Sequence, residues 1–137
     1  MKKALYLSFL FMITFVLMSG SCGKSSGGGG TNEATLSVEL NPAAGSNQAP
    51  TPGPDFPLVV TIKSTMPPSG VKIDVSARED APGSVPFFTQ SINSTTSVNN
   101  FTITNSPRGL TIRVDVTVTS LTNSSNKFSG SYTYSRK

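Results

Sequence analysis

The sequence predicts an all-β protein built from two packed antiparallel sheets. From Thr35 onward, apolar side chains alternate with polar ones almost everywhere, and this period of two is typical of half-buried strands. Downstream of residue 21 no stretch shows the apolar period of about 3.6 residues that marks an amphipathic helix. Turn-forming residues separate roughly seven alternating runs within about 100 residues, which is a spacing typical of β-sandwiches.

The first 21 residues are typical of a secretory signal peptide. Lys2 and Lys3 give a basic start, an uncharged apolar run extends from Ala4 to Met18, and small residues follow. This run of about fifteen residues is shorter than the roughly 20 that span a bilayer, so a retained transmembrane anchor is the weaker alternative. We therefore expect residues 1–21 to be removed.

Cys22, the only cysteine, follows this segment directly. Leu17-Met18-Ser19-Gly20-Ser21-Cys22 resembles the lipobox of bacterial lipoproteins, and its relaxed form in a chain rich in Ser, Thr and Asn resembles those of Bacteroidota, although Ser19 stands where an aliphatic residue is usual. The resemblance implies that Cys22 carries several acyl chains such as palmitate, because one chain anchors a protein only marginally. The alternative is an ordinary cleaved leader that leaves a free thiol, which is a liability in an oxidising compartment.

Residues 22–33 are expected to form a flexible tether behind the lipidated cysteine. Gly23 to Asn32 is rich in Gly and Ser, cannot bury apolar surface, and gives a reach of roughly 15 to 20 Å. Without Lys2 and Lys3, the eleven basic residues fall to nine against seven acidic ones. This near-neutral balance does not favour nucleic-acid binding, which needs a concentrated basic face.

Residues 34–137 are expected to form one domain, whose first half contains three strands. The first strand is expected at 35–40, and the proline-rich stretch 42–57 is expected to be a long loop or an irregular edge, because proline lacks the backbone donor that a central strand needs. Clean alternation then predicts strands at 58–65 and 71–78.

The second half is expected to contain four more strands. Residues 85–92 are less regular because Phe87 and Phe88 are adjacent, and a fifth strand is centred on Phe101 and Ile103. The strongest pattern runs from 110 to 121 and predicts a central strand, and the last strand is expected at 127–135. The inward residues of the strongest strand are expected to be Leu110, Ile112, Val114, Val116 and Val118.

The approach to this strongest strand resembles part of a known domain type. Pro107-Arg108-Gly109-Leu110, followed by alternating apolar residues up to Val116, resembles the corner and penultimate strand of immunoglobulin-like and fibronectin type III domains. Ile112 stands where a corner tyrosine is usual, and the chain has neither tryptophan nor a cysteine pair. The resemblance implies an immunoglobulin-like antiparallel β-sandwich over residues 34–137.

The chain offers little for catalysis or for binding a metal or cofactor. It has no histidine, which is the commonest general base and metal ligand. Asp74 and Asp115 fall on strands expected to be neighbours, but they alternate with Lys72, Arg78 and Arg113 on the same outward face. We therefore expect exposed ion pairs rather than a catalytic carboxylate pair, and no catalytic residue, metal or cofactor is assigned.

Four aromatic residues are candidates for contact with a ligand: Phe87, Phe88, Tyr132 and Tyr134. Exposed aromatic side chains on a sandwich edge can stack on sugars or bind another protein. One residue of the Phe87-Phe88 pair is the best candidate for an exposed contact. Packing within the core or at its rim is the alternative for all four, because large apolar side chains are usually buried.

The sequence favours a lipoprotein that presents a non-catalytic binding or structural module in the cell envelope. Membrane lipid would be its partner through Cys22, with an envelope protein or a glycan as a further partner and no nucleic acid. The resemblance favours the outer membrane with the domain in the periplasm, because Gly23-Lys24-Ser25-Ser26 lacks the acidic residues of lipoproteins displayed on the Bacteroidota surface; surface display is the alternative. Other candidate functions are carbohydrate binding as an accessory lipoprotein of a glycan-uptake system and, more distantly, a carboxylate-based hydrolase.

Overall fold

The structure, a computed structural model, describes residues 32–137. The signal peptide, Cys22 and most of the expected tether lie outside the described residues. The described part contains seven strands and no helix, so it offers no helical segment of the length and apolarity needed to cross a membrane. The strands are β1 (Val38–Asn41), β2 (Phe56–Ile62), β3 (Val71–Glu79), β4 (Phe88–Ser94), β5 (Val98–Ile103), β6 (Thr111–Ser120) and β7 (Lys127–Ser135).

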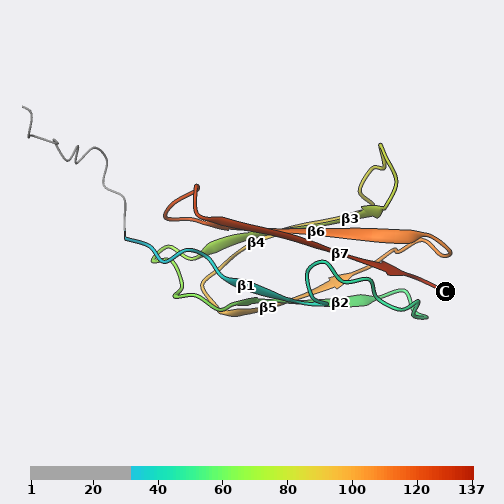
Figure 1. The fold of residues 1–137 in the computed structure, drawn as a ribbon, viewed down its shortest axis with the longest axis horizontal. Coiled ribbons are helices and arrows are strands. Elements are labelled where there is room, and N and C mark those ends of the chain that lie inside the picture. The colour runs from blue at the N-terminus through green and yellow to red at the C-terminus, as the bar shows by residue number, and fades with distance from the viewer. Residues whose placement is uncertain (1–31) are drawn as a thin grey trace, which may run out of the picture.

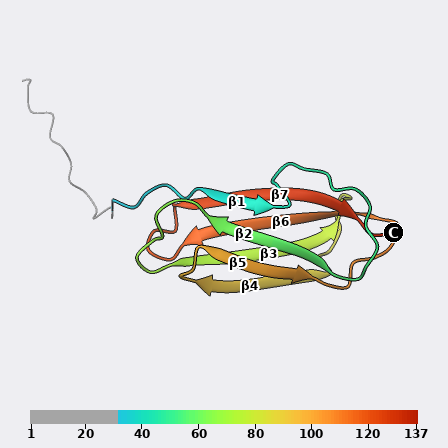
Figure 2. The same cartoon turned by 90° about the horizontal axis from the view of Figure 1, so that it is seen from below.

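The strands form two antiparallel sheets that pack as a β-sandwich, which confirms the predicted all-β class (Figure 1). One sheet has the order β1-β2-β5 and the other the order β4-β3-β6-β7. The chain crosses between the sheets after β2, β4 and β5. As a result, β1 and β7 lie along one side of the sandwich and β4 and β5 along the opposite side (Figure 2).

The core is formed by the inward residues of the alternating strands. Leu58, Val60 and Ile62 of β2 are buried, and so is the whole inward row of β3, as the sequence predicted. Each buried Val, Leu or Ile side chain in these rows contributes roughly 1.5 to 3 kcal/mol through burial. Within the described residues 32–137, the core side chains of both sheets form one continuous hydrophobic cluster.

β6 is a central strand, as predicted, but its inward row is one residue shorter than expected. Ile112, Val114, Val116 and Val118 are almost completely buried, whereas Leu110 is 37% exposed. Gly109 has a φ of +73° and its N–H donates to the Arg136 carbonyl, so the chain turns immediately before the strand begins at Thr111. The inward assignment of Leu110 was therefore wrong because this residue belongs to the turn.

β2 begins earlier than predicted and includes a proline. Phe56 is buried and Pro57 is exposed within the strand, although residues up to 57 were expected to be loop. β1 ends at Asn41, which lies opposite Val59, so the first residues of β2 have a neighbouring strand on one side only. Pro57 therefore occupies an edge position, where a missing donor is tolerated.

β4 begins later than predicted because an irregular loop precedes it. Residues 80–87 connect β3 to β4 and project from the end of the sandwich (Figure 1). Phe88 is the strand partner of Ala77, and the Phe87 N–H donates to the same Ala77 carbonyl at 3.0 Å. Two residues thus oppose one, which is the arrangement of a β-bulge, and both phenylalanines pack against the core.

A segment of the proline-rich stretch covers the free edge of β7. Residues 45–51, here called the strap, run parallel to β7 and exchange backbone hydrogen bonds with it. The Gly45, Gln48 and Thr51 N–H groups donate to β7 carbonyls at 2.7 to 3.1 Å, and Thr133 N–H donates back to Ser46. The sequence predicted a loop or an irregular edge for this stretch, but not its pairing with a strand over 80 residues away.

The start of the described chain is fixed to the turn between β6 and β7. Glu33 accepts hydrogen bonds from the Ser120 hydroxyl at 3.0 Å and from the Asn126 amide at 2.5 Å. Asn126 also donates to the Ala34 carbonyl and accepts from the Leu36 N–H. Glu33 was assigned to the tether, and in the structure it contacts the domain. The chain therefore enters the sandwich at the end opposite to the C-terminus (Figure 1).

Candidate functional site

A cluster of charged residues lies on the outer face of the four-stranded sheet. Because side chains alternate along a strand, the inward apolar rows of β3 and β6 leave Asp74 and Arg78 of β3, and Arg113 and Asp115 of β6, on this outer face. The register pairs Arg78 with Arg113 and places Asp115 opposite Ser76. The sequence predicted this set of residues and their shared face.

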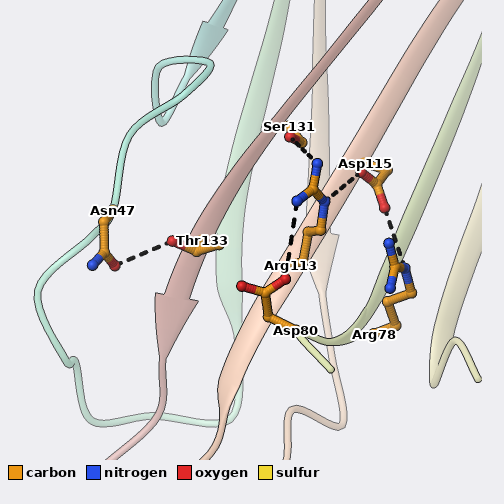
Figure 3. A network of polar contacts seen from close by, with 7 residues as sticks. All are labelled: Asn47, Arg78, Asp80, Arg113, Asp115, Ser131 and Thr133. Carbon is orange, nitrogen blue, oxygen red and sulfur yellow. Dashed lines mark hydrogen bonds and ion pairs between the residues drawn. The ribbon is translucent and has the colours of Figure 1, made fainter. Parts of the chain in front are cut away.

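Asp115 lies between two guanidinium groups in a continuous polar network (Figure 3). Its carboxylate oxygens contact Arg113 Nε at 3.0 Å and Arg78 Nε at 3.4 Å. Arg113 also reaches Asp80 at 3.9 Å and donates to the Ser131 hydroxyl at 3.0 Å. Two like-charged arginines can therefore sit directly opposite one another, because both share the charge of Asp115.

Asp74 has a separate set of partners on the same face. The Ser91 hydroxyl donates to Asp74 Oδ1 at 2.6 Å, and Lys72 Nζ lies 3.0 Å from the same oxygen. The Ser91 hydrogen bond holds the pKa of Asp74 below its usual value; partial burial opposes this effect and Lys72 adds to it. A carboxyl group held in its ionised form in this way is poorly suited to act as a general acid.

The two carboxylates line the same shallow hollow, but each is paired with basic side chains and not with the other carboxylate. Asp74 and Asp115 both line a depression of about 310 Å³ on the outer face, together with Ser76, Thr89, Gln90, Ser91 and Thr117. Asp74 is paired with Lys72 of its own strand, and Asp115 with Arg113 of its own strand and Arg78 of β3. The predicted ion pairing between strands is therefore confirmed only for Arg78 and Asp115. Exposed pairs of this kind contribute about 0 to 1 kcal/mol each. Between residues 32 and 137, no group of three or more potential acidic, His or Cys ligands comes together around a metal position.

Tyr132 and Tyr134, two of the four candidates for contact with a ligand, are part of the core, so core packing, the alternative for these residues, is what the structure shows. Both are only 2% exposed. The Tyr134 ring stacks on Phe56 with centroids 4.1 Å apart, and its hydroxyl shares a hydrogen bond with the buried Ser106. Burial raises the pKa of both tyrosines, strongly so for Tyr132, whose hydroxyl has no hydrogen-bond partner among the described residues. β7 points these rings between the sheets, and the strap covers the edge beside them.

A second hollow, of about 240 Å³, lies between the strap and the seam of the two sheets. Its walls include Pro42, Gln48, Thr51, Asp55 and Pro57, and the two tyrosines lie at its base. Because the tyrosine rings expose only 2% of their surface, they do not offer a free face on which a sugar ring could stack.

Phe87 and Phe88 are half-buried at the base of the loop 80–87. Instead, the most exposed large apolar side chain of that loop is Val85, which is 82% exposed and lies next to the exposed Pro86. The exposed Leu110 belongs to the β5–β6 connection, which reaches the same end of the sandwich (Figure 1). Sequence reasoning placed Val85 within a strand, although Pro82, Gly83 and Pro86 around it were signals of a loop.

The two ends of the sandwich therefore differ. One end holds Glu33 and the β6–β7 turn, and the other presents the loop 80–87, the β5–β6 connection and the C-terminus (Figure 1). We call these the entry end and the far end. No protein-family model matches the chain, and no curated protein matches it.

Proposed function

We propose that this protein is a lipid-anchored lipoprotein of the bacterial cell envelope, similar to those of Bacteroidota, and that its sandwich is a non-catalytic binding or structural module. The signal peptide of residues 1–21 would be removed, and Cys22 would carry the acyl chains. The domain would lie on the periplasmic side of the outer membrane, held by a short tether.

The observation that supports this arrangement most directly is the fixed entry of the chain at one end of the sandwich. Glu33 is bonded to Ser120 and Asn126, so a tether that begins at Cys22 joins the domain at the entry end. The far end, which presents the loop 80–87, would then face away from the membrane. Exposed apolar side chains occur at both ends, Val85 and Leu110 at the far end and Val98 and Leu121 at the entry end. Loops positioned by a rigid sheet are common places for binding residues.

We further propose that the sandwich belongs to the immunoglobulin-like and fibronectin type III-like architecture. If the strands are named in order A, B, C, C′, E, F and G, the sheets become A-B-E and C′-C-F-G. Immunoglobulin constant-type domains group A-B-E-D and C-F-G, so the present order differs in placing the fourth strand beside the third.

The anchor is tested by the mass of the mature protein from the envelope of a cell that expresses the full chain. We expect a chain that starts at Cys22 and carries several acyl chains, and we expect Cys22→Ala to lose both the added mass and the membrane association. Ser19→Ala is the matched control, because it changes the same segment without removing the acylated atom. A mature chain that starts elsewhere, or carries no acyl group, would overturn the anchor.

The binding role is tested by placing a photo-crosslinking residue at Val85, with the same residue at Ser124 of the β6–β7 turn as the control. We expect crosslinked envelope products from the far end and few from the entry end. Equal products from both positions would count against a binding surface at the far end. Carbohydrate binding by aromatic stacking has less support, because the two tyrosines are covered and both phenylalanines pack against the core.

A further inference from the structure

The four edge strands of the sandwich are not equally protected. Natural proteins protect sheet edges with charges, prolines, bulges, very short strands or a covering segment, because an open edge can pair with another strand. β1 has four residues, carries the Glu39–Lys63 ion pair at 3.4 Å, and is followed by Pro42. The edge of β7 is covered by the strap.

The opposite side of the sandwich lacks these protections. β4 and β5 form both edges on that side (Figure 2). Residues 81–107 contain no charged side chain. Neither strand contains proline. β4 keeps an unbroken register with β3 from Ser94 to Phe88, so the bulge at Phe87 lies before the strand and leaves its seven residues straight. We call β4 and β5 together the open side.

We propose that the open side pairs with the open side of a second copy of this chain, with β4 running antiparallel to β4 of the second copy about a twofold axis at Ser91. Such a pairing would join the two four-stranded sheets into one continuous sheet. The same axis would bring the two β5 edges toward each other in the second layer. Twofold dimers of identical chains are the commonest form of oligomer.

The composition of β4 favours a second copy as the partner, because the strand is complementary to itself. About Ser91, Thr89 lies opposite Asn93 of the second copy on the outer face, and Gln90 lies opposite Ile92 on the inner face. No two like charges meet, and hydroxyl and amide side chains pair favourably between neighbouring strands. The half-buried Phe88 and Ile92 lie in the row of β4 that faces the core, and this row would continue on the same face into the second copy.

The charges nearest the axis also permit this pairing. Asp74 of β3 lies beside Ser91 and is paired with Lys72 at 3.0 Å. Three strand spacings, or about 14 Å, would separate the two Asp74 carboxylates in the joined sheet. This exceeds the screening length of about 8 Å at physiological ionic strength, so their repulsion is small.

The experiment measures the mass in solution of the chain from Gly23 to Lys137, which retains the described fold and lacks Cys22, so that a disulfide cannot mimic the dimer. Because one strand pair is a small interface, we expect a dimer fraction that rises between roughly 5 µM and 1 mM in sedimentation equilibrium. Amide NMR shifts that change with concentration should fall on β4 and β5 and not on β1. A monomer across the whole range would overturn the pairing.

Two double variants at exposed positions test the register. T89K with N93K places a lysine opposite a lysine at both outer pairs, and we expect the dissociation constant to rise by roughly tenfold or more. T89K with N93E places opposite charges at the same two pairs and should restore dimerisation. Ser129→Lys, an exposed position on β7, is the control and should leave the dimer unchanged.

Circular dichroism must show that each variant is folded, so that loss of the dimer is not loss of the domain. A dimer that is insensitive to T89K with N93K would contradict the β4 interface. A charge swap that fails to restore dimerisation would contradict the antiparallel register about Ser91.

Discussion

Asp74 shows how the environment of a single carboxylate decides between structural and catalytic roles. Its partners are Ser91 and Lys72, and both favour the ionised form. Asp115 lies between Arg78 and Arg113. The alternation of acidic and basic residues on one face was visible in the sequence, and it was sufficient to predict ion pairing. The hydroxyl of Ser91 was not foreseen, because its contact depends on the register between β3 and β4.

The lowered pKa of Asp74 predicts a pH-dependent difference between the wild-type chain and Asp74→Asn. The folded state holds this pKa below the ordinary 3.8, so ionised Asp74 stabilises the fold above that pH and the contribution is lost as the pH falls through the folded pKa. Because the group is 40% exposed, we expect no more than about 0.5 kcal/mol at neutral pH. Urea unfolding of both chains from pH 2.5 to 7 should show the two stabilities converging at the acidic end. A difference that grows toward low pH would contradict this prediction.

Two substitutions to alanine that look alike in the sequence are predicted to lower the free energy of unfolding by very different amounts, because only one of them lies in the inward row of β6. Ile112 is fully buried, so Ile112→Ala should lower the free energy of unfolding by about 2 to 5 kcal/mol. Leu110 lies in the turn and is 37% exposed, so Leu110→Ala should change it by about 0.5 kcal/mol or less. Chemical unfolding of both variants measures the contrast. Similar costs at the two positions would show that the alternating row extends to Leu110.

At the scale of the elements, the sequence predicted what depends on local alternation and missed what depends on distant partners. The strand at 127–135 and the inward rows of β2 and β3 are as predicted. The early start of β2 at Phe56 depends on where β1 ends opposite it, and the late start of β4 depends on the bulge at Phe87. Neither the end of β1 nor the bulge at Phe87 can be predicted from the alternation within β2 or β4.

The strap is the clearest case of an element without a local signal. Its contacts with β7 are made largely by backbone groups, so its side chains need no alternation, and the prolines of the stretch 42–57 suggested only a loop. The strap explains why Tyr132 and Tyr134 are covered at an edge of the sandwich. Sequence reasoning counted these tyrosines as surface candidates because it could not see what covered β7.

Replacing one strap residue by proline should loosen the edge of β7. Gln48→Pro removes the N–H that donates to the Thr133 carbonyl at 2.8 Å, at a cost of about 0.5 to 1.5 kcal/mol. Ala49→Pro is the matched control, because the Ala49 N–H takes no part in the bonds between strap and β7. Hydrogen exchange should become faster at Thr133, which donates to Ser46, and remain unchanged in β3. Equal effects of the two prolines would argue that this hydrogen bond does not hold the strap.

At the scale of the whole molecule, the three proposed roles use different parts of the sandwich. Anchoring concerns the entry end, binding concerns the far end, and self-pairing concerns the open side formed by β4 and β5. The strap protects the side opposite to the open side. A sheet edge left open on one side only can extend the assembly by one further copy and then stop, whereas two open sides would allow continued growth.

The single cysteine can be used as a probe to test which end of the sandwich lies near the anchor. In the unacylated chain from Cys22 to Lys137, a nitroxide label on Cys22 broadens the NMR signals of nearby amides. The expected tether reaches roughly 15 to 20 Å from the entry end, and a strand of nine residues adds about 30 Å between the two ends. We therefore expect broadening at Asn126 and in the β2–β3 turn, and little at Val85 or Leu110.

Removing the hydrogen bonds to Glu33 gives the matched control for this measurement. Glu33→Ala removes the bonds to Ser120 and Asn126, so the label should sample a wider volume and broaden the entry end less sharply, while the far end remains unaffected. Comparable broadening at Val85 and Asn126 in the wild-type chain would mean that the tether folds back along the sandwich. The far end would then not face away from the membrane. This result would contradict the proposal that the loop 80–87 is presented for binding.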